Sequence, residues 1–202
     1  MILKPTFNFL LKSFLITGVL IFVSCGEDYV PKPKAYLRLE YPKSRYVEAE
    51  VDVPFLFETN LLATKLSYSK INATTESYGI NIEYPSLKGT IFLTYKAVEG
   101  NRKNLINFLR DAEKLTENHM IKADEIPPAS IYENEIGKVY GMFSEVKGNV
   151  ASPAQFYVTD SINHFLTGSL YFYAKPNYDS ILPAANYLQK DIKHIMETIE
   201  WK

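Results

Sequence analysis

The sequence predicts an α+β domain in which a mostly antiparallel sheet is covered by two main helices. Several segments alternate apolar and polar residues, which is typical of strands with one buried face. Two longer segments repeat apolar residues at every third or fourth position, as amphipathic helices do. The segments follow one another as strands, helix, strands, helix, whereas a parallel sheet would alternate single strands with helices.

The first group of strands precedes the first helix. Residues 36–41 alternate apolar and polar side chains, and residues 54–58 supply a second short apolar segment, so both are predicted strands. The clearest alternation runs over residues 78–84, where tyrosine and isoleucine side chains share one face. A turn at 85–89 leads into residues 90–95, and the two segments together predict a β-hairpin.

The first helix is predicted over residues 102–118, where leucine, phenylalanine and alanine recur at helical spacing. Pro127 and Pro128 follow this segment and separate it from the next elements. A second group of strands is predicted beyond them, at residues 138–146, 155–159 and 165–173.

The second helix closes the chain. Asp179 and Ser180 are suitable residues to cap its N-terminus, because their side-chain oxygens accept hydrogen bonds from free N–H groups. Pro183 fits the first turn, where its missing N–H has no intrahelical partner. The helix has an apolar stripe to place on the sheet, formed by Ala185, Leu188, Ile192, Ile195, Met196 and Ile199.

The N-terminus predicts export. Lys4 and Lys12 accompany an apolar run over residues 13–23, as in a signal peptide. This run is shorter than the roughly 20 apolar residues that a membrane-spanning helix needs. The sequence Phe-Val-Ser-Cys at residues 22–25 resembles a lipobox, in which the cysteine is acylated and becomes the new N-terminus. We therefore expect residues 1–24 to be removed and Cys25 to carry lipid.

The rest of the chain is predicted to be a tether followed by one domain. Residues 25–35 comprise the lipidated cysteine and an extended, proline-containing tether, and residues 36–202 form a single globular domain. Cys25 is the only cysteine, so an internal disulfide is excluded. The alternative for Cys25 is a buried free thiol.

Composition excludes one class of partner. A net charge of −1 and no clustered basic surface argue against nucleic-acid binding. The fifteen tyrosines are explained by a tyrosine-rich sheet, and a binding surface is the alternative explanation.

Catalytic and metal-binding motifs are weak. The three histidines, at positions 119, 164 and 194, show no spacing of metal ligands, so we expect neither a metal nor a cofactor. A Ser-His-Asp set can be assembled from Ser152 or Ser161 with His164 and Asp160, but no nucleophile elbow accompanies it. The sequence therefore favours a protein without enzymatic activity.

The segment 147–165 is the candidate for partner contacts, because polar and aromatic residues gather around two turns. We expect Asn149, Gln155 and Asn163 to be exposed there. The alternative is a turn-rich hairpin without a binding role. The full set of predicted contact residues is Asn149, Ser152, Gln155, Tyr157, Asp160, Asn163 and His164.

Long segments of the chain resemble the gliding-motility lipoprotein family GldD of the Bacteroidota. The resemblance includes the segment from Gly148-Asn149 to Asp160-Ser161, and it includes Trp201-Lys202. Its longer parts are DYVPKPK (28–34), YLRLEYP (36–42), HFLTGSLYF (164–172) and KPNYDS (175–180).

The resemblance implies a component of gliding motility that is linked to type IX secretion and adhesin export. It implies partners among the gliding or secretion proteins, a lipid anchor in the cell envelope, with the outer membrane favoured, and no catalytic residues. The pattern of elements also resembles a Mog1/PsbP-like α/β/α sandwich. The alternative function is an envelope lipoprotein that binds a ligand or acts as an enzyme on cell-envelope material.

Overall fold

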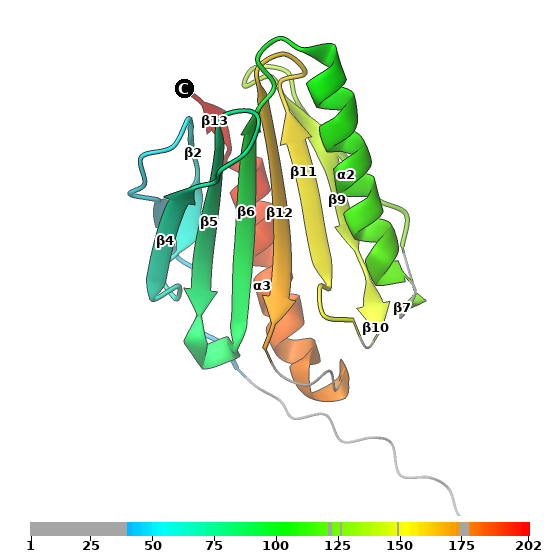
Figure 1. The fold of residues 1–202 in the computed structure, drawn as a ribbon. Helices are drawn as coiled ribbons and strands as arrows, with labels where there is room; N and C mark the ends of the chain where they lie inside the picture. Colours follow the sequence, from blue (N-terminus) through cyan, green and yellow to red (C-terminus); the bar gives the residue numbers. More distant parts are fainter. Residues whose placement is uncertain (1–39, 121–122, 126, 149, 174–177) are drawn as a thin grey trace, which may run out of the picture. The chain divides into compact units, whose positions relative to one another are not determined.

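The centre of the fold is a seven-stranded sheet (Figure 1). The computed structural model describes residues 40–202 apart from 121–122, 126, 149 and 174–177. All strand pairings in this part of the chain are antiparallel, which confirms the predicted α+β class. The spatial order is β4 (Lys65–Lys70), β5 (Ser77–Tyr84), β6 (Gly89–Ala97), β12 (His164–Phe172), β11 (Ala154–Thr159), β9 (Val139–Glu145) and β8 (Ser130–Asn134).

One face of the sheet packs against α3 (Tyr178–Glu197) and forms the main core. The strands supply every second side chain to this core, as the period-two pattern predicts. The predicted apolar stripe of the last helix is confirmed, because its large members are almost completely buried. The central core side chains are Ile80, Ile82, Leu93, Leu166, Leu170, Leu188, Ile192 and Ile195.

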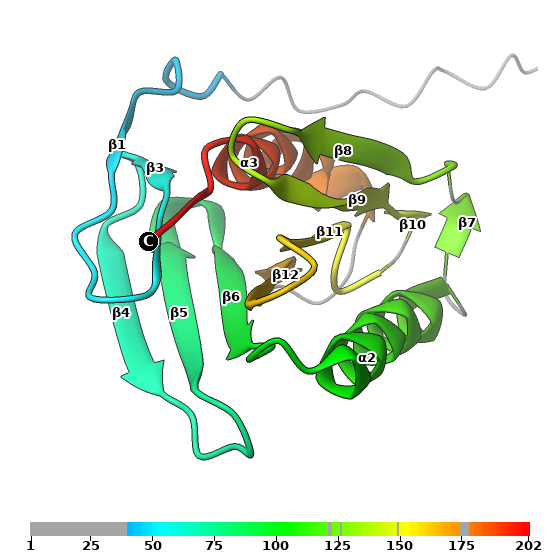
Figure 2. The same ribbon diagram turned by 90° about the horizontal axis from the view of Figure 1, so that it is seen from above.

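The opposite face carries α2 (Arg102–Met120), which lies over β12, β11 and β9, so this part of the sheet has a helix on each face (Figure 2). Among the described side chains of this helix, only Phe108 and Ala112 are buried, in a small cluster with Val98 and Phe165. Neither of the described α-helices covers β4, β5 and β6 on this face (Figures 1 and 2). The packing of α2 is therefore much less extensive than that of α3.

Short elements complete the fold. The 3-10 turn η1 (Pro85–Leu87) joins β5 to β6, as the predicted hairpin requires. Three two-stranded pairs lie outside the main sheet: β1 (Tyr46–Glu48) with β3 (Glu58–Asn60), β2 (Phe55–Leu56) with β13 (Glu200–Trp201), and β7 (Ala123–Glu125) with β10 (Lys147–Gly148).

Two local predictions are wrong. Of the strand expected at 36–41, Glu40 and Tyr41 are described and lie outside any strand. Tyr41 instead packs on Tyr187 of α3, at 5.2 Å between ring centroids, and the Tyr187 hydroxyl donates to the Pro42 carbonyl. The predicted start of the last helix is also wrong: the helix begins at Tyr178, so it includes Asp179 and Ser180, and Pro183 lies inside it instead of in its first turn.

A buried polar network fastens the first described residues to α3. Asp191 is fully buried, and its carboxylate accepts hydrogen bonds from the Tyr46 hydroxyl at 2.8 Å and the Asn60 amide at 2.9 Å. Burial raises the pKa of Asp191 above its usual value, and these hydrogen bonds partly offset the rise. Burial likewise raises the pKa of Tyr46 to about 12. This network holds the segment that leads from the N-terminus into the domain.

Candidate partner-binding surface

The turn between β11 and β12 is rigidly built around Asp160. Its Oδ1 atom accepts three backbone hydrogen bonds, from the N–H groups of Ile162, Asn163 and His164, at 2.8–2.9 Å. Ser161 has a φ of 67°, a left-handed conformation that few residues adopt without such support. Asp160 therefore organises the turn, and its carboxylate is occupied by the backbone.

The loop that leads into α2 supports the same turn. The Val98 N–H donates to the Asn163 carbonyl at 2.7 Å, and the Gly100 N–H donates to the Ile162 carbonyl at 2.8 Å. The turn is thus held from both sides, which leaves little freedom for its backbone. A side chain on such a turn is held in place before any partner arrives, which reduces the entropy lost on binding.

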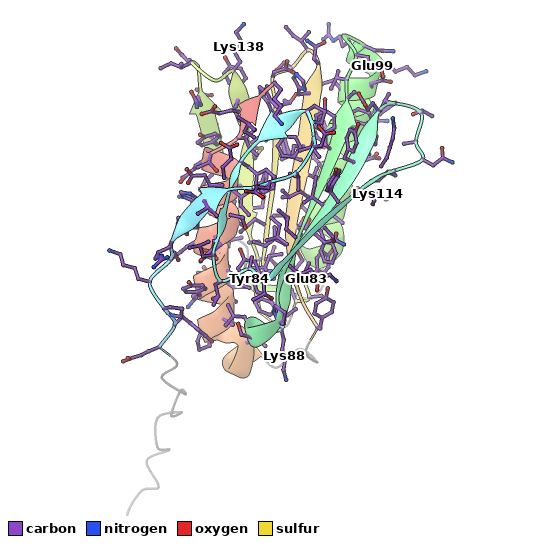
Figure 3. All side chains as sticks on the ribbon, turned by 90° about the vertical axis from the view of Figure 1, so that its left-hand side faces the viewer. Glu83, Tyr84, Lys88, Glu99, Lys114 and Lys138 are labelled. Atoms are coloured by element: carbon purple, nitrogen blue, oxygen red, sulfur yellow. The ribbon has the colours of Figure 1, made fainter. Side chains whose placement is uncertain are left out.

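Trp201 connects this turn to the neighbouring turn between β8 and β9. Its ring stacks on His164, with centroids 4.9 Å apart and planes 6° from parallel. Its Nε1–H donates to the Lys138 carbonyl at 3.1 Å. Figure 3 labels Lys138 and Glu99 at this end of the sheet and Lys88 at the opposite end. The last strand pair of the chain thereby joins two turns that are far apart in sequence.

His164 lies half-buried between Trp201 and Tyr95. Its Nδ1 atom is 2.8 Å from the Tyr95 hydroxyl, which donates to Nδ1 in the neutral tautomer that carries its proton on Nε2. Burial lowers the pKa of His164 below its usual value, and the charge of Asp160 opposes this shift. The half-buried position of His164 beside the two aromatic rings therefore favours neutral imidazole.

Two isoleucines extend from these turns into solvent. Ile136, between β8 and β9, is 99% exposed, and Ile162, between β11 and β12, is 57% exposed. A single exposed apolar residue is ordinary on a protein surface, but these two lie on turns that Trp201 joins, which makes this end of the sheet a candidate interaction site. We call residues 135–138, residues 160–163 and Trp201 the two-turn surface. Sequence reasoning missed Ile136, although an isoleucine next to Gly137 within a turn is an available signal.

The predicted contact residues Asp160, Asn163 and His164 lie together on or beside this surface. Asn163 is exposed, as expected. Ser152 is fully buried at the other end of β11, where the neighbouring Ala151 carbonyl accepts from the Phe172 N–H at 3.4 Å. Asn149 lies outside the described residues.

Gln155 and Tyr157 face α2. Gln155 is 3% exposed, so the expectation that it is exposed is wrong, because α2 covers this face of β11. Its Oε1 atom accepts from the Thr116 hydroxyl at 3.2 Å. Tyr157 stacks on Phe165, with centroids 5.9 Å apart. The described members of the predicted set therefore divide between the two-turn surface, the α2 side of the sheet and the opposite end of β11.

The side chains of Asp160 and His164 are both engaged in contacts that hold the turn. The Asp160 carboxylate binds backbone N–H groups, and the His164 ring binds Tyr95 and Trp201. Within the described part of the chain, no group of three or more histidine, cysteine or acidic side chains is placed to hold a metal ion. The Nε2 atom of His194, on α3, lies 2.7 Å from Glu58 Oε2, and the ring stacks on Tyr46.

No described helix combines the length and the apolar character needed to cross a membrane.

Comparison with known proteins identifies a matching family. A family model described as gliding motility lipoprotein GldD matches residues 26–201. No curated protein and no solved structure matches the chain at a significant level. The likeness to a Mog1/PsbP-like sandwich therefore stays a prediction, although helices do cover both faces of the sheet.

Proposed function

The chain belongs to the GldD family of gliding motility lipoproteins, and from this membership we propose that it is a non-enzymatic assembly component of the motility apparatus. The family description gives a lipid-anchored protein of the cell envelope. We further propose that Cys25 carries the lipid, that the anchor is in the outer membrane, and that the apparatus includes the type IX secretion and adhesin-export proteins.

The observation that supports a role in assembly is the two-turn surface. It combines two exposed isoleucines with turns that are fixed by Asp160 and Trp201. Apolar anchors on a rigid frame, beside polar groups such as Asn163, are the usual centre of a protein interface. We propose that a protein of the motility or secretion machinery docks here, with Ile136 and Ile162 buried in the complex.

The test is a double variant, Ile136→Ser with Ile162→Ser, expressed in place of the chromosomal copy. Both side chains are exposed, so we expect the free energy of unfolding to change by no more than about 0.5 kcal/mol for each site. Gliding is expected to fall sharply while the lipoprotein stays at normal abundance in the membrane fraction.

The matched control is Ile131→Ser. Ile131 is 74% exposed on β8 and lies outside the two-turn surface, so this variant should glide normally. Normal gliding of the double variant, or an equal defect in the Ile131 control, would contradict the proposed surface.

A further inference from the structure

A cavity of about 240 Å³ lies between α2 and the sheet. Its wall on the helix side is formed by the second half of α2, with Ala112, Leu115 and Thr116. Its floor is formed by β9, β11 and β12, which contribute Met142, Ser144, Gln155, Tyr157, Thr167 and Ser169. The space is bounded mainly by apolar atoms, with side-chain hydroxyl and amide groups among them.

The floor of the cavity differs from the other face of the same strands. Toward α3, these strands present large apolar side chains that fill the core, such as Phe143, Phe156 and Leu170. Toward α2, Ser144, Thr167 and Ser169 place small polar side chains at the cavity, beside the larger Met142 and Tyr157. A helix packed only for stability would be met by large side chains that leave little space. The residues of this face instead leave a cavity and line it with hydroxyl groups.

Gln155 supplies a second, independent observation. The side chain is 3% exposed and lines the cavity, and its carbonyl oxygen accepts from Thr116. Its amide nitrogen is buried and has no hydrogen-bond partner among the described residues. Buried polar groups in proteins are nearly always paired, so an orphan donor beside an open space indicates a missing acceptor.

The charges beside the cavity limit what it can hold. Glu113 and Glu117 are exposed residues of α2 that belong to its lining. None of the described lining residues carries a positive charge. An anion would therefore meet repulsion without a compensating partner, whereas a neutral or cationic group would not.

We propose that this cavity binds a small neutral or cationic molecule that has an apolar ring or short chain and a hydrogen-bond acceptor for Gln155. A cavity of 150 Å³ is known to hold benzene, so this one accommodates a bicyclic ring of about ten non-hydrogen atoms. The site is separate from the two-turn surface and does not depend on the proposed docking function.

The test uses three probes with the same bicyclic ring and different charge: indole, tryptamine and indole-3-acetate. Binding to the purified lipid-free domain, with the tether retained, is measured by saturation-transfer NMR and by calorimetry at neutral pH and low salt. Indole and tryptamine are expected to bind, and indole-3-acetate is expected to bind at least tenfold more weakly than tryptamine. Failure of both indole and tryptamine to bind would overturn the proposal.

Three variants test where the probes bind. Ser169→Leu fills the cavity from β12 and should abolish indole binding, whereas Ser67→Leu on β4 makes the same substitution away from the cavity and should not. The double variant Glu113→Gln with Glu117→Gln alters only exposed positions and should bring the two charged probes to similar affinities. Indole binding that is unchanged in a folded Ser169→Leu variant would overturn the site, as would charge discrimination that survives in the glutamine variant.

Discussion

Trp201 lies flat against His164, and the same indole donates its N–H to the Lys138 carbonyl. These two contacts join the β11–β12 turn to the β8–β9 turn at one end of the sheet. Trp201 is itself positioned by the pairing of β13 with β2, in which it lies opposite Phe55. The penultimate residue of the chain thus fixes the relative position of the two turns on which the exposed isoleucines lie.

Replacing Trp201 tests this connection. Trp201→Phe keeps a ring beside His164 but removes the hydrogen bond to Lys138, so the free energy of unfolding should fall by about 1 kcal/mol. Hydrogen exchange should speed up in both turns, 135–138 and 160–163, and not around η1 at the opposite end of the sheet. Unchanged exchange in residues 135–138 would show that the indole does not hold that turn.

Asp160 and Asn163 should behave differently although they share a turn. Asp160→Ala leaves three backbone N–H groups without their acceptor. We therefore expect the free energy of unfolding to fall by about 1.5–3 kcal/mol, and gliding to be impaired as a consequence. Asn163→Ala should change stability by no more than about 0.5 kcal/mol, because the side chain is exposed. Paired measurements of urea unfolding and gliding distinguish the two roles. A large loss of stability in Asn163→Ala would show that this side chain supports the turn.

The pH dependence of stability should reveal the lowered pKa of His164 in the folded protein. Its pKa in the folded protein is lowered by burial, so the unfolded chain takes up a proton at a pH where the folded chain does not. Stability from this group is therefore complete above about pH 6.5 and decreases as the pH falls below that value. His164→Phe should give a shallower loss of stability than the native protein between about pH 6.5 and 5. Parallel curves for the two proteins would contradict the assigned direction of the pKa shift.

The network around Asp191 predicts a strong effect of one hydroxyl. Tyr46→Phe removes the 2.8 Å hydrogen bond to the buried carboxylate and should lower the free energy of unfolding by about 1.5–3 kcal/mol. Tyr68→Phe provides the control, because Tyr68 is 47% exposed on β4 and should tolerate the loss of its hydroxyl. Equal effects of the two substitutions in urea unfolding would show that the buried network contributes no special stability.

Lipid attachment is predicted to depend on Cys25. Cys25→Ala removes the only thiol in the chain, so labelled palmitate should no longer be incorporated. Each buried methylene of an acyl chain contributes about 0.8 kcal/mol to membrane binding, so the loss of the acyl chains should release the protein from the membrane. Incorporation of palmitate in the mutant at the native level would assign the lipid to another residue.

The sequence alone was sufficient to predict the helices and strands that bury one regular face. The alternation in β5 and the stripe in α3 predict both the element and its buried side, because the core selects the same periodicity that appears in the chain. β4 was missed because its residues, Lys-Leu-Ser-Tyr-Ser-Lys, are mostly polar, as is common for a strand at the edge of a sheet.

The candidate site was less predictable because it depends on contacts between distant segments. The turn at 160–163 is visible in the sequence, and the polar residues around it are correctly placed in a loop. The burial of Gln155 was not foreseen, because local sequence does not reveal that α2 covers β11. The role of Trp201 depends on contacts with Lys138 and His164, which cannot be predicted from a local sequence pattern.

Site-specific photocrosslinking in gliding cells tests most directly whether the two-turn surface contacts a partner. A photoreactive amino acid is placed in turn at positions 136, 162 and 131, with the lipid anchor intact. Positions 136 and 162 should give the same adduct with one protein of the motility or secretion machinery, and position 131 should give none. The absence of an adduct at positions 136 and 162, or an equal yield of it at position 131, would contradict the account.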